Sequence, residues 1–385
     1  MSSVLPLSGL TVVEIGHSVA APFCGWIFAE LGAEVVKVEK LDGGDDARSW
    51  GPPFVEGSSA LFNTLNRNKK SIALDLKRAE DLAALKDFIQ AQADVVIQNM
   101  RPGTVDRFGL DAAALRRSKP GLIYCNIGAY GPVGPLRANP GYDPLMQAFG
   151  GIMSVTGEEG RPPVRVGPSL VDQGTGMWAV IGVVSALYRR RATGEGAEVD
   201  TSLFETAVSW VSPHVANFVA SGDVPRRLGS ENPGICPYRV FEATDGWLVI
   251  AAGNDTLYAR LVGVLEEPAL LENPDFRTNP DRVRNRDRLN GLIADIVARR
   301  GRQDWLDRLV AAGVPCAPVQ SVDELVAHPQ MIASGMLQPP PQGEFPLLGL
   351  PVLFDRERPP YRNAPPALGA DTDIVKAEDR LKKNA

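Results

Sequence analysis

Residues 11–40, TVVEIGHSVAAPFCGWIFAELGAEVVKVEK, contain a complete strand–helix–strand unit. The runs at 11–16 and 33–40 are rich in valine and isoleucine, which is typical of buried strands. Residues 21–32 between them predict a helix that ends at Gly32. Because such a helix joins two parallel strands by a right-handed crossover, this stretch predicts an α/β fold.

Further strand-like runs at 71–76, 94–99 and 121–128 extend this pattern to a Rossmann-like parallel sheet in a large domain, residues 1–222. Residues 223–322 predict a small α+β domain, with a hairpin that turns at Asp245–Gly246. The proline-rich segment 323–385 is expected to return to the large domain and complete it. The turn after the first strand, GHSVAAPFCG, lacks the GxGxxG pattern, which counts against an NAD enzyme.

Composition restricts the classes of protein further. The chain has 385 residues, 44% of them hydrophobic, and a formal net charge of −6, so general nucleic-acid binding is not expected. No apolar run has membrane-spanning length and the N-terminus lacks a signal-peptide pattern, so no membrane association is expected. Four scattered cysteines predict a reducing, cytoplasmic compartment, and three widely separated histidines argue against a metal site.

Residues 66–78, NRNKKSIALDLKR, form the most basic stretch of the chain. An anionic ligand needs a local basic pocket, and these cations flank a predicted strand, where ligand sites of α/β proteins lie. The alternative is a solvated charged surface. The cations are Arg67, Lys69, Lys70, Lys77 and Arg78.

Asp172 lies in GPSLVDQGTGMWAVIGVV, residues 167–184. The pattern predicts an apolar lead-in, a turn with Gly174 and Gly176, and then a buried apolar helix that ends at Gly194. The positive end of the helix dipole would help the Asp172 carboxylate to stay ionised and nucleophilic. The alternative is that Asp172 is only the N-cap of this helix.

The chain resembles the family III CoA-transferases (CaiB/BaiF family) over nearly its whole length. The resemblance rests on LSGLTVVEIGHSVAAPFC (7–24), NRNKKSIALDLK (66–77), DVVIQNMRPGTVDRFGLD (94–111), GYDPLMQAFGG (141–151) and the stretch around Asp172. It implies that Asp172 is the catalytic nucleophile. Its carboxylate would attack an acyl-CoA to give a mixed anhydride and then an aspartyl-CoA thioester. No permanently bound cofactor is implied, because the CoA thioester is a substrate.

The resemblance also implies contacts with coenzyme A. His17 and Ala20 would lie near the pantetheine arm, Lys40 at the nucleotide phosphates, and Leu74 and Lys77 beside the adenine. Asn99, Arg107 and Arg137 complete the implied CoA-binding set.

Tyr142 is expected in the acyl site, and it separates two activities of the same fold. Related α-methylacyl-CoA racemases resemble this chain but place a histidine at this position as an acid/base group. A tyrosine, with a reference pKa of about 10, is a better hydrogen-bond donor than a base at neutral pH. Transferase is therefore favoured, with racemase as the alternative and a non-enzymatic CoA-binding protein as the second rival.

The substrates are expected to be an acyl-CoA, succinyl-CoA as donor, and a small carboxylic or dicarboxylic acid. Unlike formyl-CoA transferase, the chain has Val19 where that enzyme has glutamine, and it has no glycine-run flap. Residues 229–238 could take part of that lid role. A second carboxylate would need an arginine, for which Arg48, Arg165 and Arg227 are candidates. The resemblance also implies an interlocked homodimer.

Overall fold

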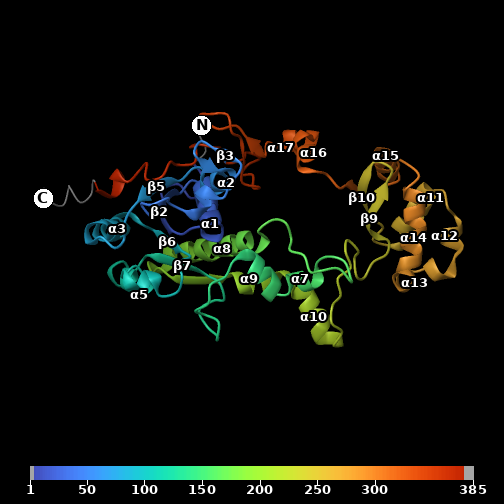
Figure 1. The fold of residues 1–385 in the computed structure, drawn as a ribbon, viewed down its shortest axis with the longest axis horizontal. Coiled ribbons are helices and arrows are strands. Elements are labelled where there is room, and N and C mark those ends of the chain that lie inside the picture. The colour runs from blue at the N-terminus through green and yellow to red at the C-terminus, as the bar shows by residue number, and fades with distance from the viewer. Residues whose placement is uncertain (1–3, 377–385) are drawn as a thin grey trace. The chain divides into compact units, whose positions relative to one another are not determined.

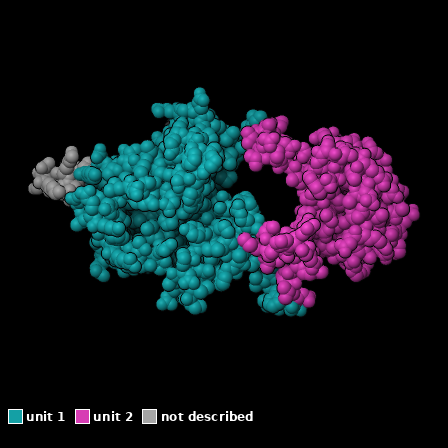
Figure 2. All heavy atoms as spheres, viewed as in Figure 1, with its two compact units in different colours: residues 1–152, 165–222, 330–385 teal, residues 153–164, 223–329 magenta. Residues whose placement is uncertain are grey.

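The computed structural model describes residues 4–376 and divides into two compact units (Figure 2). Unit 1 comprises residues 1–152, 165–222 and 330–385, and unit 2 comprises residues 153–164 and 223–329. The longer segment of unit 2 runs from 223 to 329. Unit 2 also takes in residues 153–164, because Glu158 forms a β-bridge with Leu228 and the Gly229 amide donates to the Gly157 carbonyl at 2.8 Å.

A six-stranded parallel sheet forms the centre of unit 1 (Figure 1). Its strands are β1 (Thr11–Ile15), β2 (Glu34–Glu39), β5 (Lys70–Ala73), β6 (Val95–Gln98), β7 (Ile123–Gly128) and β8 (Glu198–Ser202). The spatial order is β5-β2-β1-β6-β7-β8, with every neighbouring pair parallel. This confirms the predicted parallel sheet. In doubly wound sheets of this order, ligands bind at the carboxyl ends of the strands where the order reverses, here β1 and β6.

Helices connect these strands, as the sequence predicts. They are α1 (Ala20–Glu30), α2 (Ala60–Asn66), α3 (Ala79–Gln92), α4 (Thr104–Arg107), α5 (Ala112–Ser118), α6 (Asp143–Phe149), α7 (Ile152–Val155), α8 (Leu170–Thr193), α9 (Leu203–Trp210) and α10 (Ser212–Ser221). Short elements, β3 (Phe54–Val55), β4 (Ser58–Ser59) and a 3-10 turn (Asp46–Ser49), lie between β2 and α2.

Helix α8 differs from its prediction at its start. It begins at Leu170, so there is no glycine-rich turn before it. A Cβ at Gly176 would meet the Ala20 carbonyl oxygen at 2.8 Å, and one at Gly174 would meet Trp210 and Thr206 at 3.0 Å. These glycines therefore allow α8 to pack closely on α1 and α9. The predicted end is confirmed, because Gly194 closes the helix in the left-handed conformation, with φ of 74°.

The apolar side of α8 is only half covered within the chain. Met177, Trp178 and Ile181 are each 46–53% exposed, contrary to the expectation of a buried helix. By length and composition alone, this 24-residue helix could cross a membrane, so the expectation that no apolar run is long enough was wrong. Half of the most apolar 18-residue stretch of α8 is buried, and core helices of soluble proteins can be equally long and apolar.

The C-terminal segment returns to unit 1, which confirms that part of the predicted fold. The Asn68 amide donates to the Asn363 carbonyl and the Ser71 amide to the Asp371 carboxylate, both at 2.9 Å. The elements of this segment are the end of α17 (Pro329–Ser334), β12 (Leu337–Gln338) and β13 (Leu347–Leu348).

Unit 2 is an antiparallel sheet with helices, the predicted α+β arrangement. The strands, in the order β11-β10-β9, are β9 (Tyr238–Ala243), β10 (Gly246–Ala251) and β11 (Cys316–Pro318). The hairpin turn is Thr244–Asp245, one residue earlier than predicted. Trp305, Tyr258 and Phe276 fill the core. The helices are α11 (Asp255–Leu265), α12 (Ala269–Glu272), a 3-10 turn (Pro274–Phe276), α13 (Asn279–Arg284), α14 (Arg286–Val297), α15 (Arg302–Ala311) and α16 (Val322–Ala327).

Candidate active site

Two adjoining hollows lie in unit 1 at the carboxyl ends of β1, β2, β5 and β6. The outer groove, about 590 Å³, is lined by residues 15–17, 38–42, 44–46, 74–77, Met100 and Phe108. The inner cavity, about 270 Å³, is lined by residues 17–20, Asp46, 99–102, 127–129, 139–142, Asp172 and Leu203. Both include His17, Asp46 and Met100. An elongated ligand could therefore reach from Lys77 to Asp172.

Asp172 is the third residue of α8, and a different aspartate caps this helix. Ser169, at the N-cap position, provides no side-chain hydrogen bond. Instead, the carboxylate of Asp143, the first residue of α6, accepts from the backbone amides of Val171 at 2.8 Å and Asp172 at 3.1 Å. The alternative that Asp172 is the N-cap is therefore wrong, and its side chain is left for another role.

The Asp172 carboxylate has no stabilising partner in the part of the chain that the structure describes: no hydrogen bond or ion pair to it is found there. Burial first, and then the negative charge of Asp143, raise the Asp172 pKa to about 7. The sequence led us to expect that the positive end of the helix dipole, which the backbone amides of the first turn carry, would keep this carboxylate ionised. Asp143 occupies two of those amides, so this stabilisation is incomplete.

The turn between β1 and α1, residues 17–20, also lines the inner cavity. Asn99 holds this turn by both ends of its amide, accepting from the His17 amide at 3.0 Å and donating to the His17 carbonyl at 2.9 Å. The His17 ring contacts the Ser18 hydroxyl at 2.9 Å, and burial lowers its pKa, so it is mainly neutral at pH 7. Asn99 thus holds the backbone of the turn.

The structure gathers most of the site residues expected from the sequence. His17, Lys40, Leu74 and Lys77 line the outer groove, and His17, Ala20, Asn99, Tyr142 and Asp172 line the inner cavity. Lys40 is exposed and pairs with Asp46 at 2.7 Å. Arg107 lines neither hollow. Arg137 lines a third cavity of about 380 Å³, which adjoins the inner one through residues 100–102.

The basic stretch 66–78 is not a ligand pocket as a whole, contrary to expectation. Arg67 is fully buried and forms an ion pair with Glu30 at 2.6 Å, and buried Lys69 pairs with Glu14 at 2.7 Å. Lys70 and Arg78 form surface ion pairs, and only Lys77 of the five lines the outer groove. Most of this stretch therefore stabilises the fold.

None of the three arginines suggested for a second carboxylate lines the inner cavity. Arg48 binds Glu39 at 2.7 and 2.8 Å, and Arg165 donates to the Gly167 carbonyl. Arg227 lines a cavity within unit 2. Among the described residues, the arginine that lines the inner cavity is Arg101.

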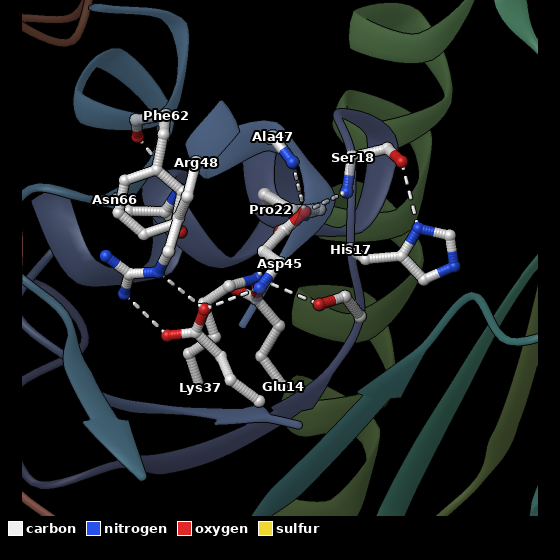
Figure 3. A network of polar contacts seen from close by, with 12 residues as sticks. Glu14, His17, Ser18, Pro22, Lys37, Asp45, Ala47, Arg48, Phe62 and Asn66 are labelled. Atoms are coloured by element: carbon white, nitrogen blue, oxygen red, sulfur yellow. Dashed lines mark hydrogen bonds and ion pairs between the residues drawn. The ribbon is translucent and has the colours of Figure 1, made fainter. Parts of the chain in front are cut away.

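Sequence reasoning missed two residues that shape the site, Asp143 and Asp45. Asp143 caps α8, and Asp45 accepts from the Ser18 amide at 3.0 Å (Figure 3). An aspartate followed by proline at 143–144 indicates only the start of its own helix, and nothing in GGDDARSW indicates a partner 27 residues earlier.

Comparison with known proteins is consistent with this geometry. CoA-transferase family III matches residues 7–372. A succinate–glutarate CoA-transferase of Agrobacterium fabrum is 35% identical over 97% of this chain and 95% of its own length. An acetyl-CoA:oxalate CoA-transferase of Acetobacter aceti is 38% identical over 86% of this chain and 85% of its own.

A solved structure has the same fold. A CAIB/BAIF family protein from Brucella suis is 38% identical, with a TM-score of 0.89, over 98% of this chain and all of that chain.

Proposed function

The chain belongs to the family III CoA-transferases, and from that premise we propose that it moves CoA from succinyl-CoA to a small carboxylic or dicarboxylic acid through a covalent intermediate on Asp172. The observation that carries the proposal is the Asp172 carboxylate itself. It is half-buried, has no hydrogen-bond or ion-pair partner among the described residues, and lies in the wall of a cavity that adjoins a long groove. A carboxylate that nothing neutralises is suited to nucleophilic attack.

In the proposed reaction, an Asp172 oxygen attacks the thioester carbonyl of the donor. The C–S bond breaks, leaving a mixed anhydride and CoA thiolate. The thiolate then attacks the Asp172 carbonyl, which releases the donor carboxylate and leaves an aspartyl-CoA thioester. An acceptor carboxylate reverses these steps and leaves with CoA. Carboxylates and thiolates exchange throughout, so no net proton transfer or redox step is needed, but water must be excluded from the anhydride.

In this proposal the nucleotide of CoA binds in the outer groove, and its pantetheine arm and thioester bind in the inner cavity. Val38, Leu74 and Phe108 give the outer groove an apolar surface for adenine, with Lys77 beside it, and Lys40 gives it a positive charge for the phosphates. The turn at 17–20 would guide the pantetheine arm toward Asp172, and the Tyr142 hydroxyl would face the acyl group. The roles of Arg107 and Arg137 remain those implied by the resemblance.

The proposed assembly is a homodimer in the cytoplasm. Met177, Trp178 and Ile181 expose an apolar stripe on α8, and monomers rarely leave such a stripe in water. A second copy is a better partner than a membrane, since the same helix carries Asp172 in its first turn and Arg190 and Arg191 in its last. All four cysteines are free, as fits a reducing compartment.

The test is to incubate the pure protein with succinyl-CoA and a panel of mono- and dicarboxylic acids, and to identify the CoA products by mass spectrometry. A new acyl-CoA from one or two acids is expected. Products from none of them would contradict the proposal. Exchange of the α-proton of a branched acyl-CoA in D₂O, without a new thioester, would instead support the racemase alternative. The transferase names of the reported relatives do not favour that alternative.

A further inference from the structure

A buried network of charges contacts the turn between β1 and α1, which lines the inner cavity together with Asp172 (Figure 3). Glu14 of β1 binds Lys37 at 2.8 Å and Lys69 at 2.7 Å, and all three side chains are fully buried. Lys37 also pairs with Asp45 at 2.9 Å. Glu39 binds Arg48 and accepts from the Ser71 hydroxyl at 2.6 Å. Three carboxylates and three cations balance one another in charge, although burial still lowers the pKa of Lys69 to about 8.

This network is bonded to the backbone of the turn. Lys37 donates to the Gly16 carbonyl at 2.8 Å, and Asp45 accepts from the Ser18 amide at 3.0 Å. Ser18 has φ of 70°, in the left-handed region that a serine adopts only when its surroundings hold it there. The Ser18–Asp45 bond is therefore one of the contacts that fix where the backbone enters α1, beside Ala20.

The same aspartate belongs to the wall of the outer groove. Residues 40–42 and 44–46 line that groove, and Asp45 holds this segment through its own amide, which donates to Glu39 at 2.8 Å, and through the Ala47 amide, at 3.0 Å. Although burial acts to raise it, Lys37 and the two amide donors keep the Asp45 pKa below its usual value, so Asp45 is an anion. One ionised side chain therefore joins the wall of the outer groove to the turn of the inner cavity.

We propose that Asp45 is a positioning residue that couples the two ends of bound CoA. Contacts of the nucleotide with the 40–46 wall fix the turn at 17–20 through Asp45, and the turn fixes the thioester against Asp172. Binding energy from a remote part of a substrate is in this way used at the reacting centre, which raises kcat. This inference rests on the proposed function.

The test compares two thioesters, succinyl-CoA and succinyl-pantetheine, which lacks the nucleotide. In the wild type, kcat with succinyl-CoA should be higher by roughly 100-fold or more. Asp45→Asn keeps an acceptor for the Ser18 amide but places an uncharged amide against Lys37. It should lower kcat with succinyl-CoA by roughly 30-fold, and change kcat with succinyl-pantetheine by less than about 3-fold.

The matched control is Glu30→Gln, which removes the charge from another fully buried ion pair of unit 1, that with Arg67. Glu30 lines neither hollow, so this variant should lose stability but keep the wild-type ratio of the two kcat values. An equal fall with both thioesters in Asp45→Asn would mean that Asp45 is only structural and would overturn the proposal. So would a wild type that does not prefer the CoA ester.

A second measurement depends neither on transfer nor on the folding of a variant. Adenosine 3′,5′-bisphosphate, the nucleotide end of CoA, should slow hydrogen exchange at residues 40–46 and also at 17–23 of the wild type, by roughly 5-fold or more. Slowing confined to the outer groove would refute the coupling. If the wild type forms no new acyl-CoA, the proposed function fails, and this exchange pattern still decides whether the two hollows are coupled.

Discussion

Two carboxylate sites in unit 1, the buried network and the half-buried Asp172, have opposite surroundings. Glu14 is held by two lysines, and Asp45 by Lys37 and two backbone amides. Asp172 has no such partner among the described residues. The charged residue that affects its pKa is another aspartate, Asp143, which raises it. The carboxylates of the network are paired with cations, whereas Asp172 has no cation beside it and its charged form is disfavoured.

This difference suggests that the paired carboxylates stabilise the fold and that Asp172 takes part in the reaction. Burying a charge costs several kcal/mol unless partners compensate it, so a fold retains an uncompensated carboxylate only where another requirement outweighs the cost. We therefore expect that removing charge from the network weakens the fold, and that removing it from Asp172 abolishes activity without weakening the fold.

The largest expected effect is on activity at Asp172. Asp172→Asn keeps the size of the side chain but removes the nucleophilic carboxylate, so the rate of CoA transfer should fall by roughly 10³-fold or more. The measurement is acyl-CoA formation under saturating substrates. Asp75→Asn, on the rim of the outer groove, is a control for loss of one negative charge in the same region and should lose far less. If Asp172→Asn keeps activity within about 10-fold of the wild type, Asp172 is not the nucleophile and does not differ in role from the network carboxylates.

The next effect is on stability in the network. Glu14→Gln leaves Lys37 and Lys69 short of a buried counter-charge, and breaking such a buried pair typically costs about 3–5 kcal/mol. Urea denaturation at pH 7 should show this loss. If unfolding is unchanged, the network is not what stabilises this part of the fold.

A smaller effect of opposite sign is expected for stability at Asp172. The folded chain keeps the Asp172 proton up to about pH 7, whereas the unfolded chain releases it near pH 4. Between these values the native state binds more protons, so this group lowers the free energy of unfolding as the pH rises from 4 to 7. Asp172→Asn should therefore be more stable than the wild type at pH 8, by on the order of 2 kcal/mol, and by less at pH 5. Thermal unfolding at both pH values measures this, and a variant that is less stable at pH 8 would contradict it.

The smallest effect concerns the pH dependence of activity. Since Asp172 must be ionised to attack, the rate should rise through about pH 7. Asp143→Asn retains an oxygen to cap α8 but removes the like charge, so the rise should move to lower pH by less than about one unit. Rate profiles from pH 5 to 9 test this, with Asp46→Asn, which removes a charge that lines the same cavity, as a control. A profile that does not move would mean that burial alone sets the Asp172 pKa.

The sequence predicted those features that depend on neighbours in the chain. Runs of valine at 12–13 and 35–36 indicate buried strands, and Gly194 after three arginines indicates the end of a helix. Such signals led to the sheet and, to within one residue, the hairpin.

What the sequence did not predict depends on partners that are distant in the chain. Arg67 and Lys69 resemble surface cations until Glu30 and Glu14, 37 and 55 residues earlier, are placed beside them. Gly176 resembles a turn residue until α1 is seen against it. Asp143 and Asp172, 29 residues apart, give no sign in the sequence that one caps the helix of the other. Pairwise contacts of this kind require the fold.

The most direct measurement is the mass of the intact protein after incubation with succinyl-CoA in the absence of an acceptor acid. The account predicts that one CoA becomes attached per chain, that succinate is released in equal amount, and that digestion locates CoA on the peptide containing Asp172. The adduct should be absent from Asp172→Asn. Transfer to an added acid without any such adduct, or an adduct on another residue, would contradict the account.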